Sequence, residues 1–206
     1  MPHAISASSL LRARDDLAVQ ETPFGPLCQP RVLEFDDGPL VVHVQHPLAM
    51  LHVAISTCTA FRDMFRGLPA SSPQTPLEIV LYKDEIGISP LGRDARKVET
   101  VYWSFMNLGS AQLASEQAWF VLAAVRSSVI ARLSGGMSRF MQLVFPLFFG
   151  GASSLLSGVF LPAGEGGAPA LVFGKLRAIV ADEKALKAIY HCRGAAATFP
   201  CALCTN

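Results

Sequence analysis

The chain has 206 residues, of which 51% are hydrophobic and only 16% charged, and its formal net charge is +1. This length allows one large domain, or one domain with an appendage, around a sizeable core. Residues 1–76 hold five basic and seven acidic side chains, whereas residues 77–206 hold twelve and nine. The second part therefore permits a nucleic-acid partner, but its charge is too small to require one.

The five cysteines are an odd number, and three of them lie near the C-terminus. This pattern excludes a regular secreted disulfide framework and favours a reduced, intracellular compartment. No apolar run approaches the roughly 18 residues of a membrane helix. The nearest candidate, Phe140–Leu161, is interrupted by Pro146 and three glycines, so we predict a buried helix followed by a loop. A membrane-associated protein built on residues 117–161 remains a less favoured alternative.

The domain organisation follows from a change in composition. We expect a loose N-terminus (1–22), a small α+β segment (23–68), a linker rich in Pro and Ser (69–76) and a main domain (77–206). In the small segment, Arg31–Phe35 and Leu40–Val44 flank an Asp-Gly pair and predict a hairpin. Apolar residues spaced by three and four then predict one helix over Leu48–Arg66.

The main domain contains alternating apolar and polar runs. The predicted elements are strands over Leu77–Glu85, Val98–Leu108 and Trp119–Val125, a helix over Arg126–Phe149, a strand over Ala170–Ala181 and a helix over Lys184–Tyr190. Three strands before a helix imply antiparallel pairing first, and then a crossover to the fourth strand. This order predicts an α/β fold in which the first and fourth strands are neighbours.

Two of these strands end in the same acidic dipeptide, Asp84-Glu85 and Asp182-Glu183. If the strands are neighbours, the carboxylates converge at one edge of the sheet. Converging carboxylates hold Mg²⁺ ions, which activate a water or a 3′-hydroxyl in phosphodiester chemistry. The alternative is that each pair only solvates the end of a strand, with Asp182 capping the next helix.

The same stretches carry a resemblance to a known family. Leu81–Glu85, Pro90–Gly92 and Val101–Gly109 resemble the first block of transposase-derived domains of the CACTA type, which have an RNase H-like fold. Ile179–Lys187 followed by Gly194–Asn206 is similar to a later block, in which an Asp-bearing strand leads into a Gly…Pro-Cys-x-x-Cys segment. The two islands cover roughly residues 77–206.

The resemblance implies an α/β, RNase H-like mixed sheet of three antiparallel strands and a crossover to a fourth, with flanking helices. It implies that Asp84 and Asp182 are the first two members of an acidic triad that binds Mg²⁺ or Mn²⁺ and serves DNA strand cleavage and transfer. The third acid of such families lies on a later helix, so we expect this chain to be truncated before it. We also expect DNA as partner, with a homo-oligomer left open, and a nuclear location. The rival is a catalytically inactive remnant that binds DNA or protein.

The C-terminal cysteines form a second candidate site. Cys201-Ala-Leu-Cys204 has the spacing with which two thiolates hold one Zn²⁺, but the pair is also explained by two unrelated thiols. His191 and Cys192 are further candidate ligands nine residues upstream. In the families that the chain resembles, the partner ligands lie downstream of the cysteine pair. The resemblance therefore implies half of a split zinc site.

Basic side chains surround the second acid in the sequence. The candidates for contact with a phosphate backbone are Lys175, Arg177, Lys184, Lys187 and Arg193. A solvated helix face explains Lys184 and Lys187 equally well. The sequence contains no Gly-rich phosphate loop, no serine nucleophile elbow and no His-Glu-x-x-His motif.

Overall fold

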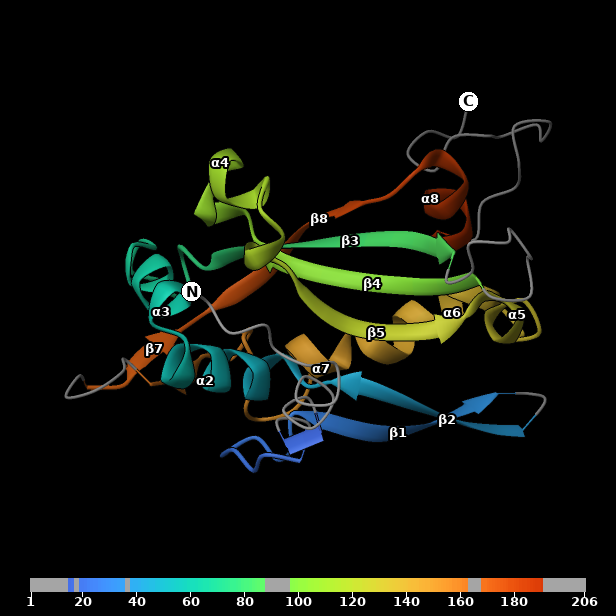
Figure 1. Cartoon of the computed structure of the whole chain (residues 1–206), viewed down its shortest axis with the longest axis horizontal. Coiled ribbons are helices and arrows are strands. Elements are labelled where there is room, and N and C mark those ends of the chain that lie inside the picture. The colour runs from blue at the N-terminus through green and yellow to red at the C-terminus, as the bar shows by residue number, and fades with distance from the viewer. Residues whose placement is uncertain (1–14, 17–18, 36–37, 88–96, 163–167, 191–206) are drawn as a thin grey trace, which may run out of the picture.

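The chain folds around a mixed sheet of six strands in the order β1-β2-β5-β4-β3-β8 (Figure 1). A computed structural model describes residues 15–16, 19–35, 38–87, 97–162 and 168–190. The strands of this sheet are β1 (Cys28–Phe35), β2 (Gly38–Gln45), β3 (Leu77–Gly87), β4 (Lys97–Phe105), β5 (Phe120–Arg126) and β8 (Gly174–Val180). Two short strands, β6 (Val159–Leu161) and β7 (Ala170–Val172), pair separately. The fold is therefore α/β, as the sequence predicts.

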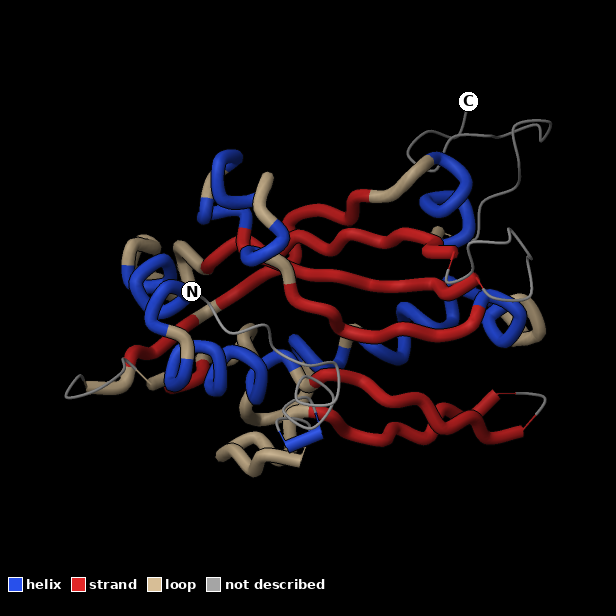
Figure 2. The backbone as a smooth tube through the Cα atoms, viewed as in Figure 1, coloured by secondary structure: helices blue, strands red, loops and turns tan. Residues whose placement is uncertain are grey.

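The described helices are short, and several follow one another with little chain between them (Figure 2). The α-helices are α2 (Pro47–Thr57), α3 (Thr59–Arg66), α4 (Ser110–Leu113), α5 (Ser127–Ile130), α6 (Gly136–Val144), α7 (Pro146–Phe149) and α8 (Glu183–Ile189). Two 3₁₀ turns, η2 (Met106–Leu108) and η3 (Glu116–Ala118), flank α4.

The connection between strands matches the predicted order. Strands β3, β4 and β5 pair antiparallel in sequence, and the chain then crosses over to β8. β8 pairs parallel with β3, from Leu77 opposite Gly174 to Tyr82 opposite Val180. The prediction that the first and fourth strands of this region are neighbours is confirmed. The predicted N-terminal hairpin is also present as β1 and β2, with Asp36 and Asp37 of its turn outside the described residues.

The hydrophobic core lies between one face of the sheet and helices α2, α6 and α7 (Figure 1). Because successive side chains of a strand point to opposite faces, Ile79 and Leu81 are buried in this core, while Tyr82 and Asp84 lie on the other face. Large, fully buried members of the core are Leu51, Trp103, Phe105, Phe140, Met141 and Phe148. The core also joins α2 to β3, so residues 69–76 connect two parts of one hydrophobic cluster.

The helix predicted over residues 48–66 is two helices. Cys58 has extended backbone angles (φ −109°, ψ 105°), which end α2 and begin α3. The side chain of Arg62 then donates hydrogen bonds to the carbonyls of Ile55 and Ser56 at 2.7 Å. These carbonyls lack partners within α2 because they lie in its last turn, and a basic side chain satisfies them. The break between α2 and α3 is therefore stabilised by hydrogen bonds from Arg62, which the spacing of apolar residues does not predict.

The helix predicted over residues 126–149 is also interrupted. Gly135 and Gly136 have φ angles of +77° and +50°, which the interior of an α-helix does not accept, so α6 begins there as a new helix after α5. Pro146 then begins α7. Helices α5, α6 and α7 therefore change direction along the core and do not form one straight helix. None of the described helices is long and apolar enough to cross a membrane.

The predicted strand over Val98–Leu108 is too long at its end, and no element was predicted for residues 109–118. β4 ends at Phe105, and the chain then forms η2, α4 and η3 before entering β5. Ser104 Oγ donates a hydrogen bond of 2.6 Å to the carbonyl of Ala118, which holds the end of this segment against the sheet. The segment therefore covers one end of the sheet face that α2, α6 and α7 leave open.

Candidate functional site

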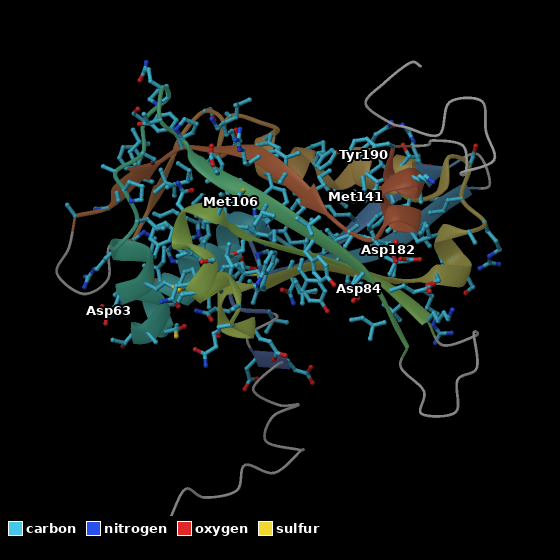
Figure 3. The ribbon with its side chains drawn as sticks, turned by 90° about the horizontal axis from the view of Figure 1, so that it is seen from above. Asp63, Asp84, Met106, Met141, Asp182 and Tyr190 are labelled. Atoms are coloured by element: carbon cyan, nitrogen blue, oxygen red, sulfur yellow. The ribbon has the colours of Figure 1, made fainter. Side chains whose placement is uncertain are left out.

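The parallel pair β3 and β8 carries the two acids that the sequence analysis singled out. Tyr82 pairs with Val180, and Asp84 and Asp182 each lie two residues further along their segments. Figure 3 shows Asp84 and Asp182 close to each other, at the end of the sheet from which α8 begins. Parallel neighbouring strands bring the same relative positions to one edge of a sheet. The fold thus places both acids in one region.

Asp84 is held by two hydrogen bonds on β3. Tyr82 Oη donates to Asp84 Oδ2 at 3.2 Å, and the backbone N–H of Glu85 donates to Asp84 Oδ1 at 2.8 Å. The side chain is half-buried. Each carboxylate oxygen has two lone pairs, so both oxygens keep acceptor capacity for a further group.

Asp182 is the N-cap of α8. Its Oδ1 accepts a hydrogen bond of 2.6 Å from the backbone N–H of Ala185, and its backbone is extended. This confirms the predicted capping role. The residue is exposed, and a cap that uses one oxygen leaves Oδ2 directed elsewhere. Capping and ligand binding are therefore compatible at this position.

Tyr82 experiences the negative potential of both acids. Burial raises the pKa of its hydroxyl above the usual value, and the charge of Asp84 and their hydrogen bond raise it further. Tyr102 and Asp182 add smaller contributions in the same direction. A nearby negative charge disfavours the phenolate form, which explains the sign. The phenol thus remains protonated and available to donate to Asp84.

A pocket of about 670 Å³ lies on the same face of the sheet, beside Asp84. Three aromatic side chains form its lining, together with two acids, Asp84 and Glu116, and two aliphatic residues. The rings are those of Tyr82, Tyr102 and Trp119. The sequence did not lead us to predict this pocket. The alternation of Tyr82 and Asp84 with buried Leu81 was the signal that could have indicated this shared face.

The other members of the two acidic dipeptides are placed differently. Glu85 Oε2 lies 3.3 Å from Nζ of Lys97 on the neighbouring strand, and the side chain of Glu183 is outside the described part of the structure. Among the described residues, no group of three His, Cys, Asp or Glu side chains is arranged to hold a metal ion. In the described part of the site, Asp84 and Asp182 are therefore the candidate carboxylate ligands for a cation.

The structure separates two of the predicted phosphate-binding residues from the acids. Lys175 and Arg177 lie near the start of β8 and contact Glu78, at 3.7 Å each. Lys175 is seven residues before Asp182, or roughly 20 Å along an extended strand. Lys187 lies half-buried on α8, and Lys184 has no described side chain. Their neighbour Arg193 falls outside the described residues.

The candidate zinc ligands also fall outside the described residues. This applies to His191, Cys192, Cys201 and Cys204, so the zinc hypothesis stays a prediction. The cysteines that the structure describes, Cys28 and Cys58, are both free thiols.

Comparison with known proteins adds no assignment. No family model matches the chain, and no curated protein is significantly similar to it. The functional argument therefore depends on the residues and geometry described above.

Proposed function

We propose that this chain is an RNase H-like, transposase-derived domain whose Asp84 and Asp182 bind a divalent cation. In a complete form, it would cleave and transfer DNA strands. The observation that carries this proposal is the parallel pairing of β3 with β8, which brings two acids, far apart in the sequence, to one edge of the sheet. The resemblance of residues 77–109 and 179–206 to CACTA-type transposase domains supports the same assignment.

The strand order supports the fold part of the proposal. An RNase H-like sheet begins with three antiparallel strands and returns to place its fourth strand parallel to the first. β3, β4, β5 and β8 have this arrangement. The hairpin β1–β2 extends the sheet beyond β5, where Val44 pairs with Ala123. This extension lies on the far side of the sheet order from β8 and leaves the acidic edge unchanged.

The acids fit a hard divalent cation. Mg²⁺ prefers oxygen ligands and is commonly bound by one or two carboxylates, with water and substrate phosphates completing its coordination. Asp84 and Asp182 provide two carboxylates, and each already has one neighbour that fixes its orientation, Tyr82 Oη or the Ala185 N–H. When bound, such an ion stabilises the negative charge that develops on a phosphodiester. The protein itself would orient the carboxylates.

A second candidate function is that of a binding module without catalytic activity. It is favoured by a specific observation: the described residues contain two converging acids and no group of three. Two carboxylates can bind a cation weakly without supporting strand cleavage. Such a remnant would bind DNA or protein through the same fold.

Metal binding can be measured with Tb³⁺, which occupies oxygen sites and luminesces when a nearby Tyr or Trp absorbs light. Tyr82 and Trp119 lie beside Asp84, so we expect sensitised emission that Mg²⁺ competes away. Asp84→Asn and Asp182→Asn should each abolish it, and Asn preserves the helix cap. Asp63→Asn is the matched control, because Asp63 lies on α3 at the opposite end of the molecule (Figure 3). Unchanged emission in both site variants would exclude the metal site.

Strand cleavage distinguishes the two candidate functions. The chain, and a version extended past Asn206, would be incubated with labelled double-stranded DNA and Mg²⁺ or Mn²⁺. Cleavage that Asp84→Asn abolishes and Asp63→Asn preserves would support the nuclease and transposase assignment. Metal binding with no cleavage by either version would favour the remnant.

A further inference from the structure

The pocket beside Asp84 has a chemical character that divalent-metal binding does not require. Its aromatic members form a continuous surface: the ring centroids of Tyr82 and Tyr102 are 5.9 Å apart, and those of Tyr82 and Trp119 are 6.0 Å apart. The planes of the first pair are inclined by 26° and those of the second by 63°. All three side chains are half-buried, so part of each ring remains accessible from the pocket.

The polar groups of this pocket are mainly hydrogen-bond acceptors. The Tyr82 hydroxyl donates to Asp84, and Trp119 Nε1 donates to the carbonyl of Leu113 at 2.9 Å. These two donors are therefore already used. The Tyr102 hydroxyl, which can donate or accept, and the carboxylates of Asp84 and Glu116 remain, and the described lining contains no Lys, Arg or His. A ligand in this pocket meets negative charge and aromatic faces.

The negative charge and the aromatic faces of the pocket favour a positively charged ligand. Two carboxylates repel an anionic group, and a neutral sugar would need donors as well as acceptors for its hydroxyls. A cation is attracted by the carboxylates and by the negative faces of the aromatic rings, within about 6 Å of their centroids. Methyl groups on the cation match the apolar area of the rings and reduce the cost of leaving water.

We propose that the pocket formed by Tyr82, Tyr102, Trp119, Asp84 and Glu116 binds a methylated organic ammonium ion. The ion could be a small free amine or a methylated lysine side chain of a peptide, because both present the same cationic group. A cross-strand tyrosine pair also stabilises a sheet. Stabilising a sheet requires neither an open cavity beside the rings nor a second acid. The pocket has both, and its second acid, Glu116, belongs to η3 and not to a strand.

The first experiment compares choline with 3,3-dimethylbutanol, which has the same shape but carbon in place of the charged nitrogen. Binding to the full chain, without divalent metal, would be followed by calorimetry and by tryptophan fluorescence. Trp103 is fully buried, so a ligand-dependent change reports on Trp119. We expect choline to bind about three- to thirty-fold more tightly than the neutral analogue. Equal affinity of the two compounds, or no binding of choline at millimolar concentration, would overturn the proposal.

Variants test which side chains are responsible. Tyr102→Leu removes a ring face and Glu116→Gln removes a charge, and each should weaken choline binding about three-fold or more. Tyr102→Phe keeps the ring and should retain binding. Tyr190→Leu, on the exposed end of α8 outside the pocket lining, is the control. Glu116 is exposed, so its substitution tests the pocket even if a Tyr102 variant folds poorly. Unchanged affinity in both Tyr102→Leu and Glu116→Gln would contradict the assignment.

A second arm identifies the source of the ammonium group. Peptides carrying trimethyllysine or unmodified lysine at one position would be titrated alongside choline. Tighter binding of the methylated peptide than of choline indicates a protein ligand, and the reverse order indicates a free amine; each supports the pocket assignment. The tests use Tyr102 and Glu116, which are outside the Asp84 and Asp182 pair. Failure of metal binding and failure of ammonium binding are therefore distinguishable.

Discussion

The two faces of the central sheet are made from alternate residues of the same strands, yet they differ in nearly every property. Toward helices α2, α6 and α7, Leu81 and Trp103 are fully buried in a continuous apolar core. Toward the opposite side, their chain neighbours Tyr82 and Tyr102 are half-buried, stacked on each other and lined up beside Asp84. One face provides stability, whereas the other keeps accessible polar and aromatic groups that a ligand can reach.

The helix-covered side also holds a buried ion pair. Lys83 Nζ lies 2.5 Å from Glu99 Oε2, and Lys83 is only 7% exposed. Lys83 precedes Asp84 directly, so a buried cation and a half-buried acid occupy adjacent positions on opposite faces of β3. A buried pair costs desolvation on both ions, and its net effect depends on the two charges being kept together.

The largest effect is expected from truncating the covered face. Trp103→Ala removes a ring that contacts Phe105, Phe120 and Phe148, and should lower the free energy of unfolding by about 3–5 kcal/mol. Tyr102→Ala, one residue away on the open face, should cost less, about 1 kcal/mol, because its ring is only partly buried. Urea unfolding of both variants measures the contrast. Equal losses would show that the open face is as well packed as the covered one.

A slightly smaller loss is expected when the buried ion pair is broken. Lys83→Met leaves the Glu99 carboxylate buried without its cation, which should cost about 3 kcal/mol. Adding Glu99→Leu should recover most of this loss, because the remaining buried charge is also removed. Urea unfolding of the wild type, Lys83→Met, Glu99→Leu and the double variant gives the coupling free energy between the two side chains. If the double variant is less stable than the single one, the pair contributes more than its desolvation cost.

A pH effect is expected where α2 meets the covered face. Burial, and then the charge of Arg31, lower the pKa of His46 from 6.5 to about 4. The unfolded chain therefore takes up a proton at higher pH than the folded one, and the free energy of unfolding should fall as pH decreases from about 6.5 to about 4. His46→Asn removes this contribution and offers a side-chain cap that His46 does not provide.

Unfolding titrations at several pH values would compare this variant with the wild type and with His43→Asn. His43→Asn, at an exposed histidine on β2, is the control for the substitution itself. Burial also lowers the pKa of His52, which acts in the same direction, so His46→Asn should reduce the slope without removing it. A slope unchanged in His46→Asn would assign the effect to other groups.

At the acidic edge, a loss of about 1 kcal/mol is expected from Asp182→Ala, because the first turn of α8 loses its cap. Asp182→Asn should be nearly neutral in stability, since Asn caps as well as Asp. The pair of variants thus separates the structural role of the side chain from its charge. Thermal unfolding measures the first role, and Tb³⁺ luminescence measures the second. Equal stability of the two variants would mean that the cap does not stabilise α8.

The smallest effect is a change of one pKa on the open face. Asp84→Asn removes a negative charge and an acceptor from Tyr82, so the pKa of this phenol should move down toward its ordinary value. Ultraviolet titration of tyrosinate resolves the change, since the chain has only three tyrosines. Asp63→Asn should leave the titration unchanged. An unaltered curve in Asp84→Asn would show that burial alone raises the pKa of Tyr82.

Local sequence patterns predicted the strands better than the helices. Leu77–Glu85 was recognised from its apolar run and its flanking Pro76 and Gly87, and β3 matches it within two residues. Each long helix was predicted as one element because its apolar period continues across the break. The breaks at Cys58 and at Gly135 depend on tertiary contacts and backbone angles, which periodicity does not report. The short helical segment at 106–118 has no strong period and was missed.

The sequence by itself determined that strands lie at Leu77–Glu85 and within Ala170–Ala181, and that the first and fourth strands of the main region are neighbours, although the second of these stretches is divided between β7 and β8. These properties are local, or follow from the order of elements along the chain. Only the tertiary structure decided that Trp119 and Glu116 join Tyr82, Tyr102 and Asp84 around one pocket. The reason is that the path of residues 106–118 over the sheet is set by packing between distant segments, which no short pattern contains.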